Sequence, residues 1–417
     1  MREERLNNGL ILRSIQSDGD VAKCAVFNTV FNNDFEGQTY QLLHRLHPAL
    51  QWQDSYLVEN ELSGEVAATI CLIPWEFDFE GVTLRAAQLE MVLSHPEYRR
   101  QGLIRLLINH FINNVSDSGY DLSIIWGIPF YYRQYGYSYC MYGNGFETLP
   151  ASHIPDAGGP ESGYRLRGAK EKDIPDLTAL YNAASAGTQI RVKRNERYWA
   201  YLLTDVKQPV KIVEDTQGSA AGYLVYTQSR DGIAHIFESG ISNHEIGLYV
   251  FQTLKKEAYR EILVGGSDEN TMVKAAKNFG SLRSKPEQWL VRITQMPSFI
   301  RKLSPVLERR LANSEFAGIN GDIVINLYRQ AYKLSFCKGK LVTADDIGFK
   351  DSSMGAYGGD LCIPQDAFIR LLFGFRTLDQ LTDAWPDIVI NPTKRCLFDI
   401  LFPRLTSHIY LPYHYLA

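Results

Sequence analysis

The spacing of hydrophobic positions changes once between residues 86 and 115. AAQLEMVLS, residues 86–94, is rich in apolar and β-branched side chains, as is typical of a buried strand. Further on, apolar residues recur at the spacing of one buried helical face: Leu103, Leu106, Leu107, Phe111 and Val115. The pattern predicts a strand, a loop and a helix, and the loop is HPEYRRQG, which ends at Gly102.

This loop places positive charge directly in front of a helix. The first N–H groups of a helix have no intrahelical partner, and the helix dipole favours an anion there. Gly102 lets a bulky ligand approach the backbone, while Arg99 and Arg100 can donate charge-assisted hydrogen bonds. A diphosphate group fits this arrangement. A solvated basic helix cap fits the spacing almost as well.

Two stretches of the chain match each other without gaps. GLILRSIQSDGDVAKCAVFN begins at Gly9 and GYRLRGAKEKDIPDLTALYN begins at Gly163, and each predicts a strand, a turn and a helix. The match indicates a duplicated domain. A chance resemblance between two amphipathic helices is the alternative. The identical pairs are Gly9/Gly163, Leu12/Leu166, Arg13/Arg167, Ala25/Ala179 and Asn28/Asn182.

Composition divides the chain of 417 residues into three parts. LPASHIPDAGGPESG, residues 149–163, is rich in Pro, Gly and Ser and predicts a linker. After QWLVRITQMPSF, an amphipathic helix, IRKLSPVLERRL, precedes strand-like DIVINLY and KLSFCKG, which indicates a third, α+β domain. We expect domains at 1–155, 156–295 and 296–417. One continuous domain from 156 to the end is the alternative.

Charge and composition narrow the class of protein. A hydrophobic fraction of 45% indicates a globular protein, and a net charge of -4 gives no general attraction to nucleic acid. MREERLNNGL lacks the apolar core of a signal peptide, and no apolar run reaches the roughly 20 residues that span a bilayer. We expect a cytoplasmic protein without nucleic-acid or membrane partners. Six scattered cysteines predict buried free thiols: Cys24, Cys71, Cys140, Cys337, Cys362 and Cys396.

The loop before the helix resembles the acetyl-CoA signature R/Q-x-x-G-x-G/A of the GNAT acetyltransferases. Ile104 stands where most of these proteins have Gly or Ala, and a bulky aliphatic there resembles the enhanced intracellular survival (Eis-like) subgroup. The resemblance implies an α/β (α+β) fold of tandem GNAT-like domains followed by a sterol-carrier-protein-like domain. It also implies a homo-oligomer, such as a hexamer. We expect the second copy to be a degenerate GNAT domain that has lost CoA binding.

The same resemblance implies which residues bind acetyl-CoA. Backbone groups of residues 92–94 would hold the pantetheine arm, and residues 100–105 would surround the diphosphate. The expected contacts are Val92, Leu93, Ser94, Arg99, Arg100, Gln101, Gly102, Leu103, Ile104, Arg105, Gly127 and Ile128.

FYYRQYGYSY contains a candidate general acid. Tyr132-x-x-x-Gly136-Tyr137 resembles the family motif Y-x-x-x-G-[FY], in which the tyrosine protonates the departing CoA thiolate. Ordinary core packing is the alternative for this aromatic run. We expect packing for the neighbours, Tyr131, Tyr135, Tyr137 and Tyr139.

The base that accepts the amine proton has two candidates. In Eis-like enzymes the terminal carboxylate serves as base, here Ala417, although this sequence lacks the family's aromatic last residue. In other GNAT proteins the base is a carboxylate on the strand before the loop, and Glu90 shares strand parity with Val92 and Ser94. We rank Ala417 slightly ahead. A solvated or salt-bridged carboxylate is the alternative for both.

The expected reaction is direct acetyl transfer from acetyl-CoA to a primary amine of an aminoglycoside, a polyamine or a lysine side chain, without a metal. Asp34 and Glu36 would border the substrate cavity and attract the cation, although a solvated loop explains either one. His44 and His47 are expected to be structural, because no third metal ligand is apparent. A catalytically silent acyl-CoA-sensing or lipid-binding module is the alternative function.

Overall fold

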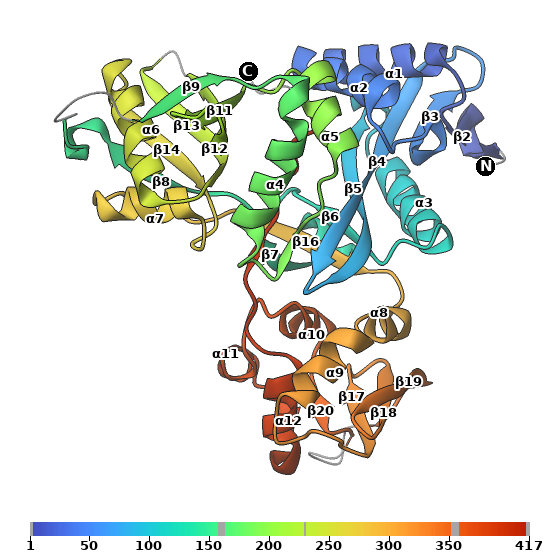
Figure 1. Cartoon of the computed structure of the whole chain (residues 1–417). Coiled ribbons are helices and arrows are strands. Elements are labelled where there is room, and N and C mark those ends of the chain that lie inside the picture. Colours follow the sequence, from blue (N-terminus) through green and yellow to red (C-terminus); the bar gives the residue numbers. More distant parts are fainter. Residues whose placement is uncertain (1–2, 157–162, 229–230, 352–357, 414–417) are drawn as a thin grey trace.

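The computed structural model describes residues 3–156, 163–228, 231–351 and 358–413. Within these ranges the chain forms three sheets and twelve α-helices, which confirms the predicted mixed α/β class. Two sheets lie in the upper part of the molecule, and the third forms a lower lobe with the last helices (Figure 1). No helix of the described ranges is both long enough and apolar enough to cross a membrane.

Helices cover both faces of the first sheet, which contains ten strands. Because side chains alternate along a strand, Leu57 and Cys71 pack with one pair of helices, whereas Val58 and Ile70 pack with a helix on the opposite face. The pair is α1 (Asp18–Phe31) and α2 (Asp34–Leu46), and the opposite helix is α3 (Leu103–Asp117). The strands in spatial order are β1 (Glu4–Arg5), β2 (Leu10–Ser14), β3 (Ser55–Asn60), β4 (Val66–Phe79), β5 (Val82–Ser94), β6 (Leu122–Ile125), β16 (Gln288–Ile293) and β7 (Ser138–Tyr142), with β10 (Ile190–Val192) attached to β4 and β22 (Ser407–His408) to β10.

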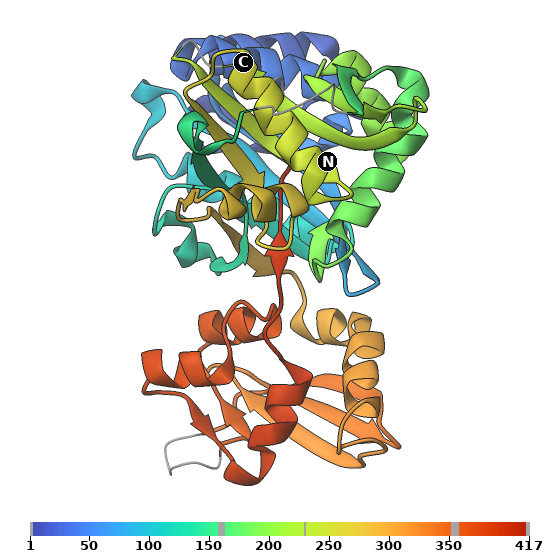
Figure 2. The same cartoon turned by 60° about the vertical axis from the view of Figure 1, so that its left-hand side comes forward.

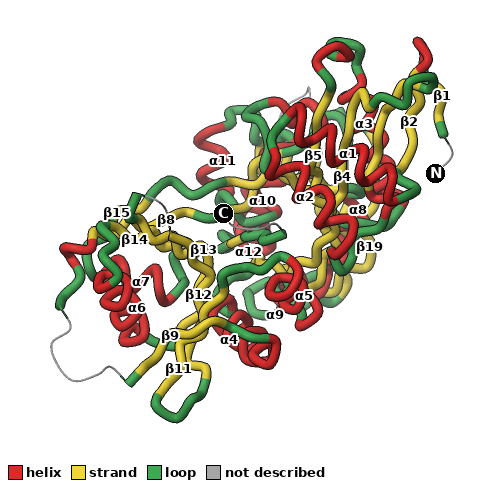
Figure 3. Tube along the Cα trace, turned by 90° about the horizontal axis from the view of Figure 1, so that it is seen from above, coloured by secondary structure: helices red, strands yellow, loops and turns green. Residues whose placement is uncertain are grey.

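The second sheet contains seven strands, and Figure 3 shows it from above, beside the first. Two helices, α6 (His244–Lys256) and α7 (Thr271–Asn278), share one core with this sheet. The helices α4 (Ile174–Ser185) and α5 (Glu196–Ala200) instead pack into the core of the first sheet. Each sheet with its helices is called a unit below. The strands in spatial order are β15 (Leu282–Arg283), β8 (Gly145–Pro150), β14 (Glu261–Gly266), β13 (Ile233–Ile241), β12 (Ala220–Gln228), β11 (Val210–Asp215) and β9 (Tyr164–Gly168).

The two sheets exchange strands across the predicted boundaries at 155 and 295. β8 precedes the linker in sequence but pairs with β14, and β16 follows the second unit but inserts between β6 and β7. Because β8 ends at Pro150, the predicted linker at 149–163 begins within the last two residues of this strand.

The repeated sequence adopts a repeated structure. β2 and β9 occupy matching positions of the alignment, and α1 and α4 follow them. Arg13 donates to Asp20 at 2.7 Å and to Glu59 at 2.7 Å. Its counterpart, Arg167, contacts Asp173 and Glu214 in the same way. In both units an arginine on the first strand thus joins the start of the helix to the neighbouring strand.

The lower lobe contains the third sheet and is linked to the upper part by a returning segment (Figure 2). This segment, residues 403–413, is called the strap below; β22 lies within it and pairs with β10. The lobe's strands in spatial order are β19 (Lys340–Gly348), β18 (Ala331–Cys337), β17 (Gly321–Asn326), β20 (Leu361–Cys362) and β21 (Val389–Ile390), and its helices are α8 (Met296–Lys302), α9 (Ser304–Ala312), α10 (Gln365–Leu372), α11 (Leu378–Ala384) and α12 (Arg395–Leu401).

The prediction of buried thiols is right for four cysteines and wrong for two. Cys337 and Cys396 are exposed. Cys337 ends β18 at a hairpin turn, and Cys396 lies on α12 outside the face formed by its buried residues. The buried thiols are Cys24, Cys71, Cys140 and Cys362.

Candidate active site

β5 and β6 separate at their carboxyl ends and open a cavity. Their parallel pairing ends at Gln88 and Ile124. Beyond this point residues 89–93 and residues 125–129 form two walls of a cavity of about 440 Å³. A third wall comes from α1 and the start of α2, through Asn28, Asn32 and Glu36.

A β-bulge shapes the cavity wall. Cys71 pairs with Glu90 and Thr69 pairs with Leu93, so two residues of β5, Met91 and Val92, lie opposite one residue of β4. Met91 adopts a positive φ of 54°. A bulge leaves one residue outside the ladder of hydrogen bonds, so Met91 and Val92 are candidates to offer a backbone polar group to a ligand.

Glu90 lies at the edge of this cavity and is held by a relay of side chains. Trp75 Nε1 donates to Gln88 Oε1 at 2.6 Å, and Gln88 Nε2 donates to Glu90 Oε1 at 2.7 Å. The Tyr413 hydroxyl of the strap also forms a hydrogen bond with Glu90. Burial raises the pKa of Glu90 to about 7, although the hydrogen bond from Gln88 opposes this, and the nearby Glu36 carboxylate raises it further.

Tyr132 faces the same cavity from a short 3-10 helix, Tyr131–Tyr135. Its side chain is buried, with only 5% exposed. Burial raises its pKa well above the ordinary value, and the neighbouring Glu90 charge acts in the same direction. The phenol therefore remains protonated at neutral pH and can act as a proton donor.

Gly127 makes room for the Tyr132 ring. A Cβ atom at this position would lie 2.3 Å from Tyr132 Cε2. Only glycine fits there without displacing the ring.

A basic groove continues from the cavity along the same strand. It has a volume of about 390 Å³ and extends from Ser94 to the start of α3. Gly102 caps this helix with a φ of 79° and no side-chain cap, so the first-turn N–H groups stay open to a ligand. Among the described residues, no carboxylate pairs with Arg99, Arg100 or Arg105, and all three line the groove.

The two hollows contain most of the residues singled out from the sequence. Two of those residues, Gln101 and Asp34, are exposed and line neither. Ala417 lies outside the described residues. The cavity contains Glu36, Glu90, Val92, Leu93, Gly127, Ile128 and Tyr132, and the groove contains Ser94, Arg99, Arg100, Gly102, Leu103, Ile104 and Arg105.

Other residues of the site were not found from the sequence. Gln88 shares strand parity with Glu90, which was a usable signal, whereas nothing local points to Tyr413 or Asn28. Tyr131 and Tyr135, expected to be core residues, line the groove. No group of three or more His, Cys, Asp or Glu side chains in the described part of the chain could hold a metal.

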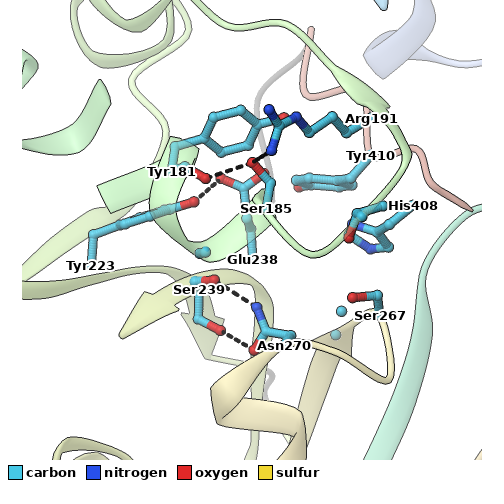
Figure 4. A pocket seen from close by; sticks show the side chains of 14 residues that line it. Tyr181, Ser185, Arg191, Tyr223, Glu238, Ser239, Ser267, Asn270, His408 and Tyr410 are labelled. Carbon is cyan, nitrogen blue, oxygen red and sulfur yellow. Dashed lines mark hydrogen bonds between the residues drawn. The ribbon is translucent and has the colours of Figure 1, made fainter. Parts of the chain in front are cut away.

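The second unit has a carboxylate, Glu238, at the position that corresponds to Glu90, but an ion pair with Arg194 neutralises its charge. The pairing of β13 and β14 ends at Ile236, and Glu238 lies two residues further, as Glu90 lies beyond Gln88. Arg194 donates to Glu238 at 2.7 and 2.8 Å, and the Tyr223 hydroxyl donates at 2.8 Å. Figure 4 shows Glu238 and Tyr223 in the cavity that results.

Comparison with known proteins defines the class of the first unit. Residues 12–140 match the profile of the acetyltransferase (GNAT) domain family. The chain therefore contains a GNAT acetyltransferase domain, which confirms the resemblance noted in the sequence. A comparison with curated proteins gives no match.

Solved structures are similar over nearly the whole chain. A GCN5-related N-acetyltransferase from Anabaena variabilis has a TM-score of 0.72 at 15% identity, covering 98% of this chain and 100% of its own. A probable N-acyltransferase from Enterococcus faecalis has a TM-score of 0.70 at 14% identity, covering 95% and 97%. Eis1 from Mycobacterium abscessus has a TM-score of 0.61 at 14% identity, covering 98% and 100%. At these identities the similarity establishes the fold.

Proposed function

We propose that this protein is an acetyl-CoA-dependent N-acetyltransferase that acts on primary amines, with its active site in the first sheet. The observation that carries the proposal is the continuity of the two hollows. Residues 89–93 of β5 line the acidic cavity, and Ser94 lines the basic groove that follows it. One strand thus borders a site for an anionic ligand and a site for a cationic one.

The basic groove suits the diphosphate of CoA. Arg99, Arg100 and Arg105 offer charge-assisted hydrogen bonds, and the uncapped start of α3 offers backbone N–H groups. The bulge at Met91 and Val92 offers backbone polar groups to the pantetheine amides. Acetyl-CoA, when bound, supplies an activated thioester.

The residues of the cavity have complementary roles in proton transfer. Glu90 accepts a proton from the attacking amine as the new N–C bond forms. The backbone N–H near Val92 donates to the thioester carbonyl oxygen. Tyr132 delivers its proton to sulfur as the C–S bond breaks. We prefer Glu90 to Ala417 as the base because its position and its raised pKa both suit the task.

The acceptor is a cationic primary amine such as an aminoglycoside, a polyamine or a lysine side chain. Two carboxylates, Glu36 and Glu90, border the cavity. Trp126 lines the same cavity and is 61% exposed, so its ring face is available to a cation. Asp34 takes no part in this proposal, because its side chain lies outside the cavity.

We also propose that the chain comprises tandem GNAT-like domains and a sterol-carrier-like domain, and that it forms a homo-oligomer. The paired networks of Arg13 and Arg167 support the duplication. The ion pair between Arg194 and Glu238 supports the loss of function in the second copy. Light scattering that gave the mass of a monomer would contradict the oligomer.

Calorimetric titration with acetyl-CoA tests the proposal. We expect one site per chain, weakened about 10-fold or more in Arg100→Ala, because a charge-assisted hydrogen bond contributes roughly 1.5–3 kcal/mol. Arg45→Ala is the control, since Arg45 is exposed on α2 and outside the groove. Amine-dependent thiol release would then establish catalysis. Binding of CoA without such release, across all three classes of amine, would favour an acyl-CoA sensor.

A further inference from the structure

A second large cavity lies where the second sheet, the lower lobe and the strap meet. Its volume is about 450 Å³, within the usual size range of small-molecule sites. It shares Gly266, Ser267 and His408 with the cavity of Figure 4, which at about 30 Å³ has room only for water-sized molecules. The proposed acetyl transfer uses neither of them.

The walls of this junction cavity carry an excess of positive charge. Arg376, Arg404 and Lys285 line it, and none of them pairs with a carboxylate among the described residues. The two carboxylates at its rim, Asp268 and Glu269, are each paired with a lysine outside the cavity, at 2.7 and 2.8 Å. In a protein with a net charge of -4, this excess is local.

Two of the cations are anchored by hydrogen bonds from Nη1 of the guanidinium group. Arg376 Nη1 donates to the Tyr142 hydroxyl at 2.9 Å and to the Phe375 carbonyl at 2.7 Å. Arg404 Nη1 donates to the Gly374 carbonyl at 2.8 Å. A guanidinium group has five N–H donors, so each arginine keeps further donors for a ligand. A group that is already anchored loses less conformational entropy when a ligand binds.

The pKa of the Tyr142 phenol reflects the positive charge at this wall of the cavity. Burial alone would raise the pKa of its phenol. Hydrogen bonds from Arg376 and Arg404 outweigh burial and lower the pKa below its ordinary value. Negative charge at the cavity wall is therefore stabilised.

We propose that this cavity binds a small polyanion, such as a polycarboxylate or a phosphate ester, through Arg376, Arg404 and Lys285. Planar guanidinium groups match the oxygen pairs of carboxylates and phosphates. Arg404 belongs to the strap, whose far end brings Tyr413 to Glu90. A bound anion would therefore fasten the strap at its base.

Calorimetric titration of the full chain with inorganic pyrophosphate and with citrate tests this site. Because the groove at Arg99 and Arg100 is itself expected to bind a diphosphate, the titrations use an Arg99→Gln/Arg100→Gln background. We expect one site to remain in that background and to weaken at least 10-fold in Arg404→Gln and at least 3-fold in Lys285→Gln. Binding of both probes would indicate recognition of charge, and binding of pyrophosphate alone would indicate recognition of phosphate.

Two controls keep the outcome clear. Arg329→Gln removes an exposed arginine from the loop between β17 and β18 and should leave the affinity unchanged. Lys285 is exposed, so Lys285→Gln should fold even where Arg404→Gln does not. The proposal would be overturned if the Arg99→Gln/Arg100→Gln variant bound neither probe. It would also be overturned if neither Lys285→Gln nor Arg404→Gln weakened the binding that remains. The proposed acetyl transfer is judged separately, by acetyl-CoA binding and thiol release.

Discussion

Glu90→Gln is the substitution that tests the mechanism most directly. Glutamine has the same shape and can still accept the hydrogen bond from Gln88, but it cannot accept a proton from the amine. The variant therefore removes the proposed base and leaves the relay from Trp75 in place.

The expected loss of activity follows from the role of the group. A positioned general base contributes about 10²- to 10⁴-fold, so kcat/KM should fall by that factor. Since burial raises the pKa of Glu90 to about 7, wild-type activity should rise with pH through that value, as the carboxylate ionises. The variant should lack this rise.

The stability of the variant should change in the opposite direction. Ionised Glu90 destabilises the folded state, because its folded pKa of about 7 lies above the ordinary value of 4.5. This cost is absent below pH 4.5, grows between 4.5 and 7, and is complete above pH 7. At ~1.4 kcal/mol per pKa unit its upper limit is about 3 kcal/mol, and partial exposure at the cavity reduces it to roughly 1–2 kcal/mol. Glu90→Gln should therefore unfold at a higher temperature than wild type at pH 8, and at the same temperature at pH 4.

Steady-state kinetics over pH 5.5–9 and thermal unfolding at pH 4 and pH 8 measure both effects. Asp34→Asn is the matched control, because Asp34 lies on the same helix as Glu36 but outside the cavity. Glu36→Gln should mainly raise the KM for the amine. If Glu90→Gln kept the wild-type pH profile, the assignment would be wrong, and the carboxylate of Ala417 would be the remaining candidate.

The remaining predictions concern the groups around this centre. Gly127→Ala should lower kcat by about 10²-fold or more, as loss of the acid would, because the new methyl group displaces the Tyr132 ring; rates at saturating acetyl-CoA would separate this loss from a change in affinity. Tyr413→Phe should shift the ascending limb of the pH profile upward, because the lost hydrogen bond had lowered the pKa of the base; an unchanged profile would refute the contact. Arg194→Ala should lower the free energy of unfolding by about 3–5 kcal/mol, because it leaves Glu238 buried without its cation; denaturant unfolding would measure it.

The local parts of the site could be predicted from the sequence. The apolar run at 86–94 lies in β5, and α3 begins at Leu103, where the helical spacing begins. Periodicity identifies such elements because it reports which face each side chain buries. Glycine and basic residues in the intervening loop then indicate its chemistry.

The parts that depend on distant pairing could not be predicted. β16 lies more than 160 residues after β6, its partner in the sheet. Nothing in its own alternation specifies which sheet edge it joins, since any edge of suitable polarity would satisfy its backbone. The same holds for the strap, and therefore for Tyr413 at the site.

The position of Asp34 outside the cavity has a simple geometric cause. Both Asp34 and Glu36 were expected near the substrate, but α2 begins at Asp34 with Asn33 as its cap. Residues two apart on a helix point about 200° apart around its axis. Only one of the two can face the cavity, and it is Glu36.

Glu90 and Glu238 lie at the same place in two similar sheets, and their surroundings account for their different chemistry. Each follows the last paired residue of a strand whose parallel neighbour then separates. The described side chains that form hydrogen bonds with Glu90, Gln88 and Tyr413, are neutral, so burial holds the pKa of Glu90 near 7, which suits the proposed role of base. Arg194 forms two hydrogen bonds to Glu238, so this carboxylate is paired with a cation inside the protein. The buried Arg194 thus distinguishes Glu238, which forms an ion pair, from Glu90, whose pKa of about 7 suits the proposed role of base.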